Sequence, residues 1–352
     1  METVRTRHRQ AASRRRAIAG WRLWLFAAFA LGAFVAVVLH FGEIEEFGAL
    51  MAGAHPIWMA LAVALQCSTY LSVAGGWSLV LAAAGTPVPL PKLGRVAVTK
   101  LFADQVLPSA GMGGNVLLVD QLRYRGASEG AAVAALLLSM LGFYAAFSGF
   151  AVLTFVLLWF HDQATPFVAG IVTLFLAVAI TIPSLALWLR RRGSRPLPKS
   201  IERFAVIKAL LETVAKAPTD LLRDRKLLVR VALCNALIFL ADAATLWVCL
   251  RALGVNAGGD TAFIAVIMAQ IVVTLGPIPL GLGSFEATST AMLRLLGVPL
   301  EAAFAATMLL RLMTLWLPLV PGLVMMRAML FSRRPRRQAL SVTKAQQDID
   351  LT

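Results

Sequence analysis

The sequence has few charged residues for its length. Only 14% of its 352 residues are Asp, Glu, Lys or Arg, whereas soluble domains carry roughly 25%. Hydrophobic residues make up 59% of the chain, the mean hydropathy is +0.78, and long apolar runs recur throughout. This composition argues against a soluble domain. It predicts an all-α polytopic membrane protein, since spanning helices satisfy their own backbone hydrogen bonds in lipid.

Cysteine and histidine are also scarce. The three cysteines, Cys67, Cys234 and Cys249, lie inside apolar segments at unrelated spacings, and we expect them to be buried small hydrophobic residues. The four histidines show no paired ligand spacing. Neither a disulfide framework nor a metal site is therefore indicated. The sequence also lacks a Walker loop and the HExxH and GxSxG motifs. We accordingly expect no metal and no other cofactor.

Acidic residues are much rarer than basic ones, with 18 Asp and Glu against 33 Lys and Arg and a net charge of +15. The basic residues cluster next to apolar runs, at residues 5–16, 190–199 and 333–337. Clusters in these places are typical of the cytoplasmic ends of membrane helices and of contact with anionic lipid heads. Nucleic-acid binding is therefore not expected.

The apolar runs predict about six full membrane spans, each near the twenty residues that a helix needs to cross a bilayer. Their charged ends place a basic arm at 1–20 and a tail at 332–352 in the cytoplasm, around a domain at 21–331 in the cytoplasmic membrane. The predicted spans are 21–39, 57–84, 131–160, 167–189, 231–250 and 302–330. The loop 190–230 is expected to hold an amphipathic helix on the inner leaflet, or equally a solvated connector helix.

Two further apolar segments are interrupted by proline and glycine. The first, 93–122, begins and ends beside basic residues, and its arms of roughly eleven residues would each reach about 16 Å. Its polar and helix-breaking residues are Asp104, Pro108, Gly111, Gly113, Gly114 and Asn115. The second contains Pro279, Gly281, Gly283 and Glu286. Broken backbone at membrane depth must be buried in protein or line a cavity, so we predict two re-entrant hairpins. The alternative for the second is a loop in the head-group region.

An internal repeat relates the two interrupted segments. Gly126 corresponds to Gly297 and Pro108 to Pro279, at a shift of 171 residues. Repeat one covers about 57–160 and repeat two about 231–331, and the predicted topology gives them opposite orientations. Inverted repeats with paired broken segments point to a transport site at the repeat interface.

Arg311 supplies a positive charge inside the last predicted span. A lone buried arginine is costly, so we expect it to pair with Glu286 or Asp242. The alternative is an ion pair that only stabilises the hairpin. The candidate substrate-binding residues are Arg311, Glu286, Pro279, Gly281, Gly283, Pro108, Gly111, Gly113, Gly114, Asn115 and Arg123. The candidates for proton or ion coupling are Asp104, Asp242 and Glu286.

These motifs resemble those of the lysylphosphatidylglycerol synthase transmembrane-region family, also called flippase-like integral membrane proteins. The resemblance covers most of residues 20–330 and rests on the segments 107–115 and 279–286 and on Arg311 with the Trp-Leu-Pro that begins at Trp316. It implies a region that moves or presents lipids with charged or glycosylated heads. Because the sequence ends at Thr352, we expect the cytosolic aminoacyltransferase domain of some relatives to be absent. The chain departs from the family where Asn115 and Leu118 replace frequent charged residues.

The leading hypothesis is therefore a lipid translocase for an anionic or glycosylated membrane lipid, and a transporter rather than an enzyme. One alternative is a membrane-embedded transferase acting on a lipid-linked substrate. Another is a non-catalytic subunit whose partners are lipid-biosynthesis enzymes.

Overall fold

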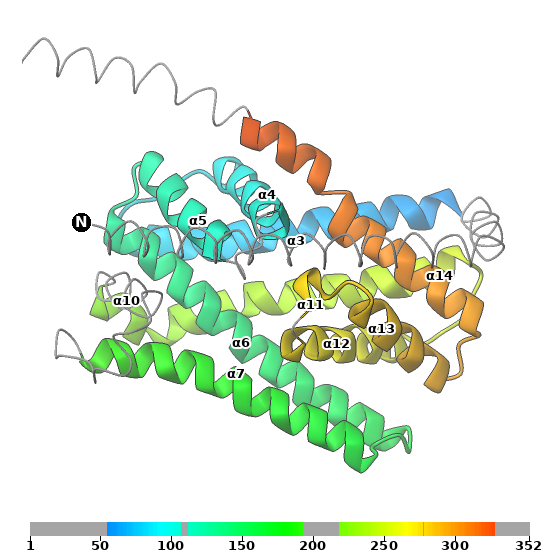
Figure 1. The fold of residues 1–352 in the computed structure, drawn as a ribbon. Coiled ribbons are helices and arrows are strands. Elements are labelled where there is room, and N and C mark those ends of the chain that lie inside the picture. The colour runs from blue at the N-terminus through cyan, green and yellow to red at the C-terminus, as the bar shows by residue number, and fades with distance from the viewer. Residues whose placement is uncertain (1–54, 107–111, 193–217, 277, 328–352) are drawn as a thin grey trace, which may run out of the picture. The chain divides into compact units, whose positions relative to one another are not determined.

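The computed structural model describes residues 55–106, 112–192, 218–276 and 278–327, and every regular element in these ranges is a helix (Figure 1). The predicted span 21–39, both terminal segments and most of the loop 190–230 lie outside the described residues. Four of the described helical segments are long and apolar enough to cross a membrane: Pro56–Ala83, Glu129–Phe160, Arg225–Ala252 and Leu300–Arg327. The expected all-α polytopic class is confirmed, while six as the total number of spans stays a prediction.

The described chain has a long helix, two short helices and a long helix, and then repeats this order. The first set, with the helix that follows it, is α3 (Pro56–Ala83), α4 (Leu90–Val106), α5 (Met112–Tyr124), α6 (Glu129–Phe160) and α7 (Pro166–Arg192). After the short α10 (Thr219–Arg223) come α11 (Arg225–Ala252), α12 (Gly259–Leu275), α13 (Ser284–Leu295) and α14 (Leu300–Arg311). A 3-10 turn, Pro279–Gly281, precedes α13, and a π-helical turn, Leu312–Trp316, follows α14.

Helices α3 and α11, the first long helix of each set, are both followed by a glycine with a left-handed backbone. Gly85 follows α3 with φ 71°, and the next amide donates to the carbonyl of Leu81. Gly254 follows α11 with φ 77°, and the next amide donates to the carbonyl of Leu250. This left-handed turn with a six-to-one hydrogen bond is a Schellman cap, which favours glycine. The same turn follows α5 and α13.

Helices α3 and α11, which occupy equivalent places in the two halves, pack side by side in opposite directions. The backbone amide of His55, just before α3, donates to the carbonyl of Ala252 at the end of α11, at 3.1 Å. Nearby, the rings of Trp58 and Trp247 meet edge to face with centroids 6.0 Å apart. Opposed equivalent helices are what an inverted repeat requires, although the full symmetry stays a prediction.

Helix α6 packs against α11, α3, α12 and α7. Phe147 of α6 stacks on Phe239 of α11 at 4.9 Å and lies 4.3 Å from the ring of Phe175 in α7. On the same helix, Gly142 brings α6 close to the backbone of α11, because a Cβ there would lie 3.0 Å from the nitrogen of Ala232. Small residues permit such close helix approach in membranes.

Three details differ from the sequence-based expectation. Helix α11 begins at Arg225 rather than at 231, because the carboxylate of Asp224 accepts from the amides of Lys226 and Leu227 and caps it. The arms of the first hairpin have 17 and 13 residues, not eleven, so the longer arm reaches about 25 Å. Cys67 is exposed rather than buried.

The close approach at Gly142 gives a stability prediction. Gly142→Ala should lower the apparent melting temperature, because its methyl group would push α6 away from the α11 backbone, at a cost of about 1–3 kcal/mol. The measurement is intrinsic tryptophan fluorescence during heating of the purified protein.

Gly149→Ala is the matched control on the same helix, since a Cβ at Gly149 meets nothing within 4 Å. It should leave the melting temperature unchanged or raise it, because alanine favours helix over glycine. Equal effects of the two substitutions would contradict the packing argument.

Candidate functional site

The helical hairpin formed by α12 and α13 is interrupted where the sequence predicts. Helix α12 ends at Leu275, and the chain then takes left-handed backbone angles at Leu280, Gly281 and Gly283, with φ of 60°, 63° and 83°. Gly281 is required for a second reason, because a Cβ there would lie 2.3 Å from Cγ2 of Val273. The turn therefore folds back tightly on its own first arm.

Glu286 caps the helix that follows this break. The amide of Gly283 donates to Oε2 of Glu286 at 2.7 Å, in the first turn of α13. A carboxylate at a helix N-terminus satisfies a free backbone donor and complements the helix dipole. Glu286 is therefore held in place before any interaction with another side chain.

Arg311, the last residue of α14, links the hairpin to the final span. Its Nε donates to Oε1 of Glu286 at 2.7 Å, and one Nη donates to the carbonyl oxygen of Leu280 at 2.9 Å. Its guanidinium also lies 4.8 Å from the ring centroid of Phe285. The side chains of Arg311 and Glu286 are only 11% and 14% exposed. The predicted pairing of Arg311 with Glu286 is thus confirmed.

A π-helical turn directly follows Arg311. The amide of Leu317 donates to the carbonyl of Leu312 at 2.8 Å, five residues back instead of four. Pro318 contributes to this widening, because proline has no N–H and clashes with the preceding turn of a regular helix. Such bulges often occur at functional sites. Thr314 lies on this turn and contacts both of the cavities described next.

The first of these, the Arg311 cavity, has a volume of about 230 Å³ and is lined by residues from both hairpins. Gln105, from the last turn of α4, reaches it from the first hairpin, and Leu280 reaches it from the second. Its lining residues are Gln105, Asp242, Val266, Gln270, Val273, Leu280, Phe285, Leu310, Arg311, Thr314 and Leu315.

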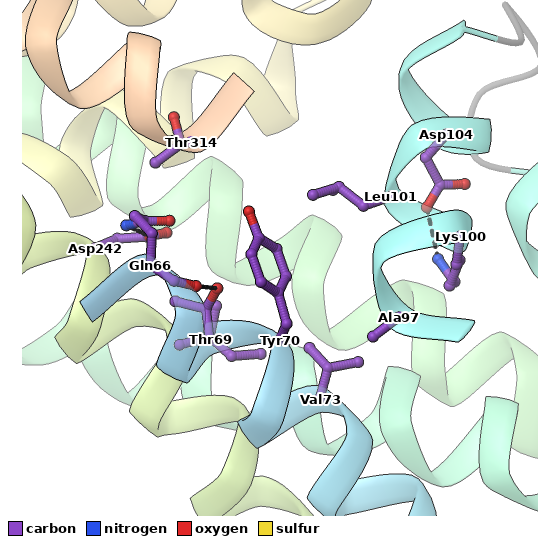
Figure 2. A pocket seen from close by; sticks show the side chains of 11 residues that line it. Gln66, Thr69, Tyr70, Val73, Ala97, Lys100, Leu101, Asp104, Asp242 and Thr314 are labelled. Atoms are coloured by element: carbon purple, nitrogen blue, oxygen red, sulfur yellow. Dashed lines mark hydrogen bonds and ion pairs between the residues drawn. The ribbon is translucent and has the colours of Figure 1, made fainter. Parts of the chain in front are cut away.

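The second, the Tyr70 cavity, has a volume of about 210 Å³ and shares Asp242 and Thr314 with the first. In Figure 2, Asp242 and Gln66 lie on one side of the Tyr70 cavity, and Lys100 and Asp104 lie on the other side. The ring of Tyr70 lies between the two pairs. Nζ of Lys100 lies 2.6 Å from Oδ2 of Asp104.

Gln66 connects the neighbouring helices α3 and α11 beside the Tyr70 cavity. Its amide nitrogen donates to Oδ1 of Asp242 and to the hydroxyl of Thr245, each at 3.0 Å. The two cavities are adjacent, because Asp242 and Thr314 line both of them.

The structure brings together only part of the predicted site. Gly114 is buried against Asp104, since a Cβ there would lie 1.9 Å from Oδ1 of that residue, so it allows the first hairpin to close. Gly113 and Asn115 are partly buried and do not line either cavity. Arg123 lies in the last turn of α5, 3.9 Å from Glu129, and lines neither cavity.

Of the remaining predicted residues, Pro279 lies in the 3-10 turn, while Pro108 and Gly111 lie outside the described residues. Sequence reasoning missed Gln66, Tyr70 and Lys100, which line the Tyr70 cavity. A glutamine in the middle of a long apolar helix was the available signal, because polar side chains at membrane depth need partners there.

The geometry around Arg311 predicts an asymmetric effect of single and double substitutions. Arg311→Ala should destabilise the protein by about 3 kcal/mol, because it leaves the half-buried Glu286 carboxylate with only a backbone donor. The measurement is the fluorescence-detected melting temperature of the purified protein.

The double variant Arg311→Ala with Glu286→Ala should be less destabilised than Arg311→Ala alone, since it removes both charges. A double variant as unstable as the sum of both single variants would contradict a direct interaction.

A family model for the lysylphosphatidylglycerol synthase TM region matches residues 16–322. The matched range contains all the residues that line the Arg311 and Tyr70 cavities. No curated protein matches the chain. Because the family match extends over most of the sequence, the chain belongs to the lysylphosphatidylglycerol synthase TM-region family of membrane proteins.

Proposed function

We propose that the protein is a lipid translocase that moves an anionic or glycosylated membrane lipid between the leaflets of the cytoplasmic membrane. The observation that carries this proposal is the position of Arg311. It offers a guanidinium to a polar cavity lined by both hairpins, at the end of an apolar helix long enough to enter the bilayer. Membership of a lipid-related membrane family supports the same role.

The contacts of Arg311 provide a place for a phosphate-bearing head group. Its present acceptors are a carboxylate oxygen of Glu286 and the carbonyl oxygen of Leu280. A phosphate also offers two oxygens, which can accept from two N–H groups of one arginine at once. In the proposed binding step, phosphate oxygens replace one or both of these acceptors.

Glu286 would not be left without a partner by this exchange. Its second oxygen, Oε2, already accepts from the amide of Gly283, and the N-terminus of α13 stabilises negative charge there. The ion pair can therefore open at a smaller cost than that of a carboxylate held by arginine alone. This makes the pair suitable as an exchangeable contact.

The chain around the break also offers an apolar surface for lipid tails. Ile278, Leu280 and Leu282 are 44%, 37% and 40% exposed although they are large hydrophobic residues. Exposed apolar side chains in a membrane protein face lipid at little cost. A lipid could thus place its head group beside Arg311 while its tails stay against this turn and in the bilayer.

The experiment is a translocation assay with the full chain in liposomes that contain phosphatidylglycerol labelled on its acyl chain beside the head group. Dithionite added outside reduces only exposed label, so movement of the inner-leaflet lipid appears as a second phase. Wild type should show this phase. Arg311→Ala should slow it at least tenfold, the loss expected when about 1.4 kcal/mol of head-group interaction is removed.

Arg311→Lys should retain part of the rate, because lysine keeps the charge but not the two-donor geometry. Arg294→Ala is the matched control, since Arg294 is an exposed arginine near the end of α13 that lines neither cavity. Equal rates in wild type, Arg311→Ala and Glu286→Gln, each assayed well below its own melting temperature, would reject the proposed site.

A further inference from the structure

Asp242 differs from the other charged residues that line the two cavities, because no cation pairs with it in the part of the chain that the structure describes. Lys100 pairs with Asp104 on α4, and Arg311 pairs with Glu286. Within the described residues no ion pair reaches Asp242, whose side-chain contact is the amide of Gln66. Two charge pairs are therefore balanced, and one carboxyl group is left without a cation.

The position of Asp242 makes this lack of a cation costly. It lies well inside α11, an apolar helix of 28 residues that is long enough to cross a membrane. An ionised carboxylate at such depth is strongly disfavoured without a positive partner, and neutralisation by a proton removes the cost. A hydrogen bond from an amide supports the group but does not cancel its charge.

Asp242 is accessible from two cavities. It lines both the Tyr70 cavity and the Arg311 cavity, so its side chain lies at their junction. The hydroxyl of Tyr70, which lines the first cavity, is buried and has no hydrogen-bond partner within the described chain. A buried hydroxyl without a partner fits a place where a water or a proton-carrying group is bound in another state.

The other titratable or charged groups facing the same space are few. In the described linings of the two cavities they are Tyr70 from α3, Lys100 and Asp104 from α4, and Arg311 at the end of α14. Helix α12 contributes Val266, Gln270 and Val273, none of which titrates, and α6 contributes nothing to either lining. Both cations are already paired, so neither of them neutralises Asp242, whereas a proton bound to its carboxylate would.

We infer that Asp242 is a proton-binding site, and that it is protonated when an anionic head group occupies the Arg311 cavity. The second half of this inference rests on the proposed function. A carboxylate repels an anion in the same cavity, so the anion favours the protonated acid. By linkage, protonation then strengthens anion binding by the same factor. In the step itself, an Asp242 oxygen takes a proton from water on one side and later returns it to water on the other.

The proton site is tested first without any transport assay. Infrared difference spectra of the reconstituted full chain, recorded between high and low pH, should contain a carbonyl band of a protonated carboxylic acid. Asp242→Asn should remove one such band and Asp242→Glu should restore one at a shifted frequency. Glu301→Gln, an exposed carboxyl at the start of α14, is the matched control and should keep it.

Identical spectra for wild type and Asp242→Asn would overturn the inference. A band that disappears when potassium in the buffer is replaced by sodium would also overturn it, because the site would then bind a metal cation. If Asp242→Asn fails to fold, the shifted band of Asp242→Glu alone decides, since glutamate keeps the acid.

Coupling is then tested in the liposome assay under imposed pH gradients of opposite direction. The wild-type rate should differ at least about fivefold between the two directions, the lower end of typical coupling factors. The rate of Asp242→Asn should be the same in both. Wild-type rates that ignore the gradient would overturn the coupling. An Asp242-dependent band in a protein that moves no lipid would support the proton site and reject the proposed function instead.

Discussion

The arrangement of the second hairpin depends on one guanidinium. Arg311 binds the carbonyl of Leu280, inside the break between α12 and α13, and a carboxylate oxygen of Glu286, in the first turn of α13. Leu280 has left-handed backbone angles that non-glycine residues rarely adopt. At membrane depth no water is present to donate to the carbonyl oxygen of Leu280, so the hydrogen bond from Arg311 stabilises this backbone conformation. The residue that holds the turn also lines the Arg311 cavity.

Residues from both halves of the chain line the Arg311 cavity. Gln105 from the first hairpin and Leu280 from the second contact the same space, although they are far apart in the sequence. Each hairpin lies close to a charge pair, Lys100 with Asp104 or Arg311 with Glu286. Arg311 lines the cavity that Gln105 of the first hairpin also lines. Lys100 and Asp104 line the Tyr70 cavity, together with residues of α3 and α11 and with Thr314. This supports a site shared between the halves of the chain.

The helical class, the ends of two long helices and the break in the second hairpin could be predicted from the sequence. Apolar runs and helix-breaking proline and glycine residues are local signals that need no knowledge of distant contacts. The ends of α3 and α6 agree closely with the predicted spans, and the break around Gly281 was placed correctly. The cost of burying one charge alone predicted that Arg311 pairs with Glu286 or Asp242, and the structure shows that the partner is Glu286.

Contacts between distant helices were harder to predict. Gln66 and Asp242 lie on α3 and α11, and only the packing of these helices brings them within hydrogen-bonding distance. Tyr70 and Lys100 carry no distinctive pattern in sequence, since tyrosine and lysine are also common at the ends of membrane helices. The start of α11 was misplaced because Arg225 and Lys226 suggested a loop, whereas Asp224 provides a cap for a helix that continues into the membrane.

The π-helical turn after Arg311 has a consequence for the rest of the final span. One additional residue in a turn rotates everything beyond it by about 100° relative to a regular helix. Residues before and after the turn therefore follow two different registers, and a single helical wheel drawn through the span mixes its lipid-facing and protein-facing sides. Gly322 illustrates the second register, since a Cβ there would lie 2.6 Å from Cβ of Phe102 in α4. The shift in register aims this small residue at the first hairpin, and thereby lets one span serve both halves of the chain.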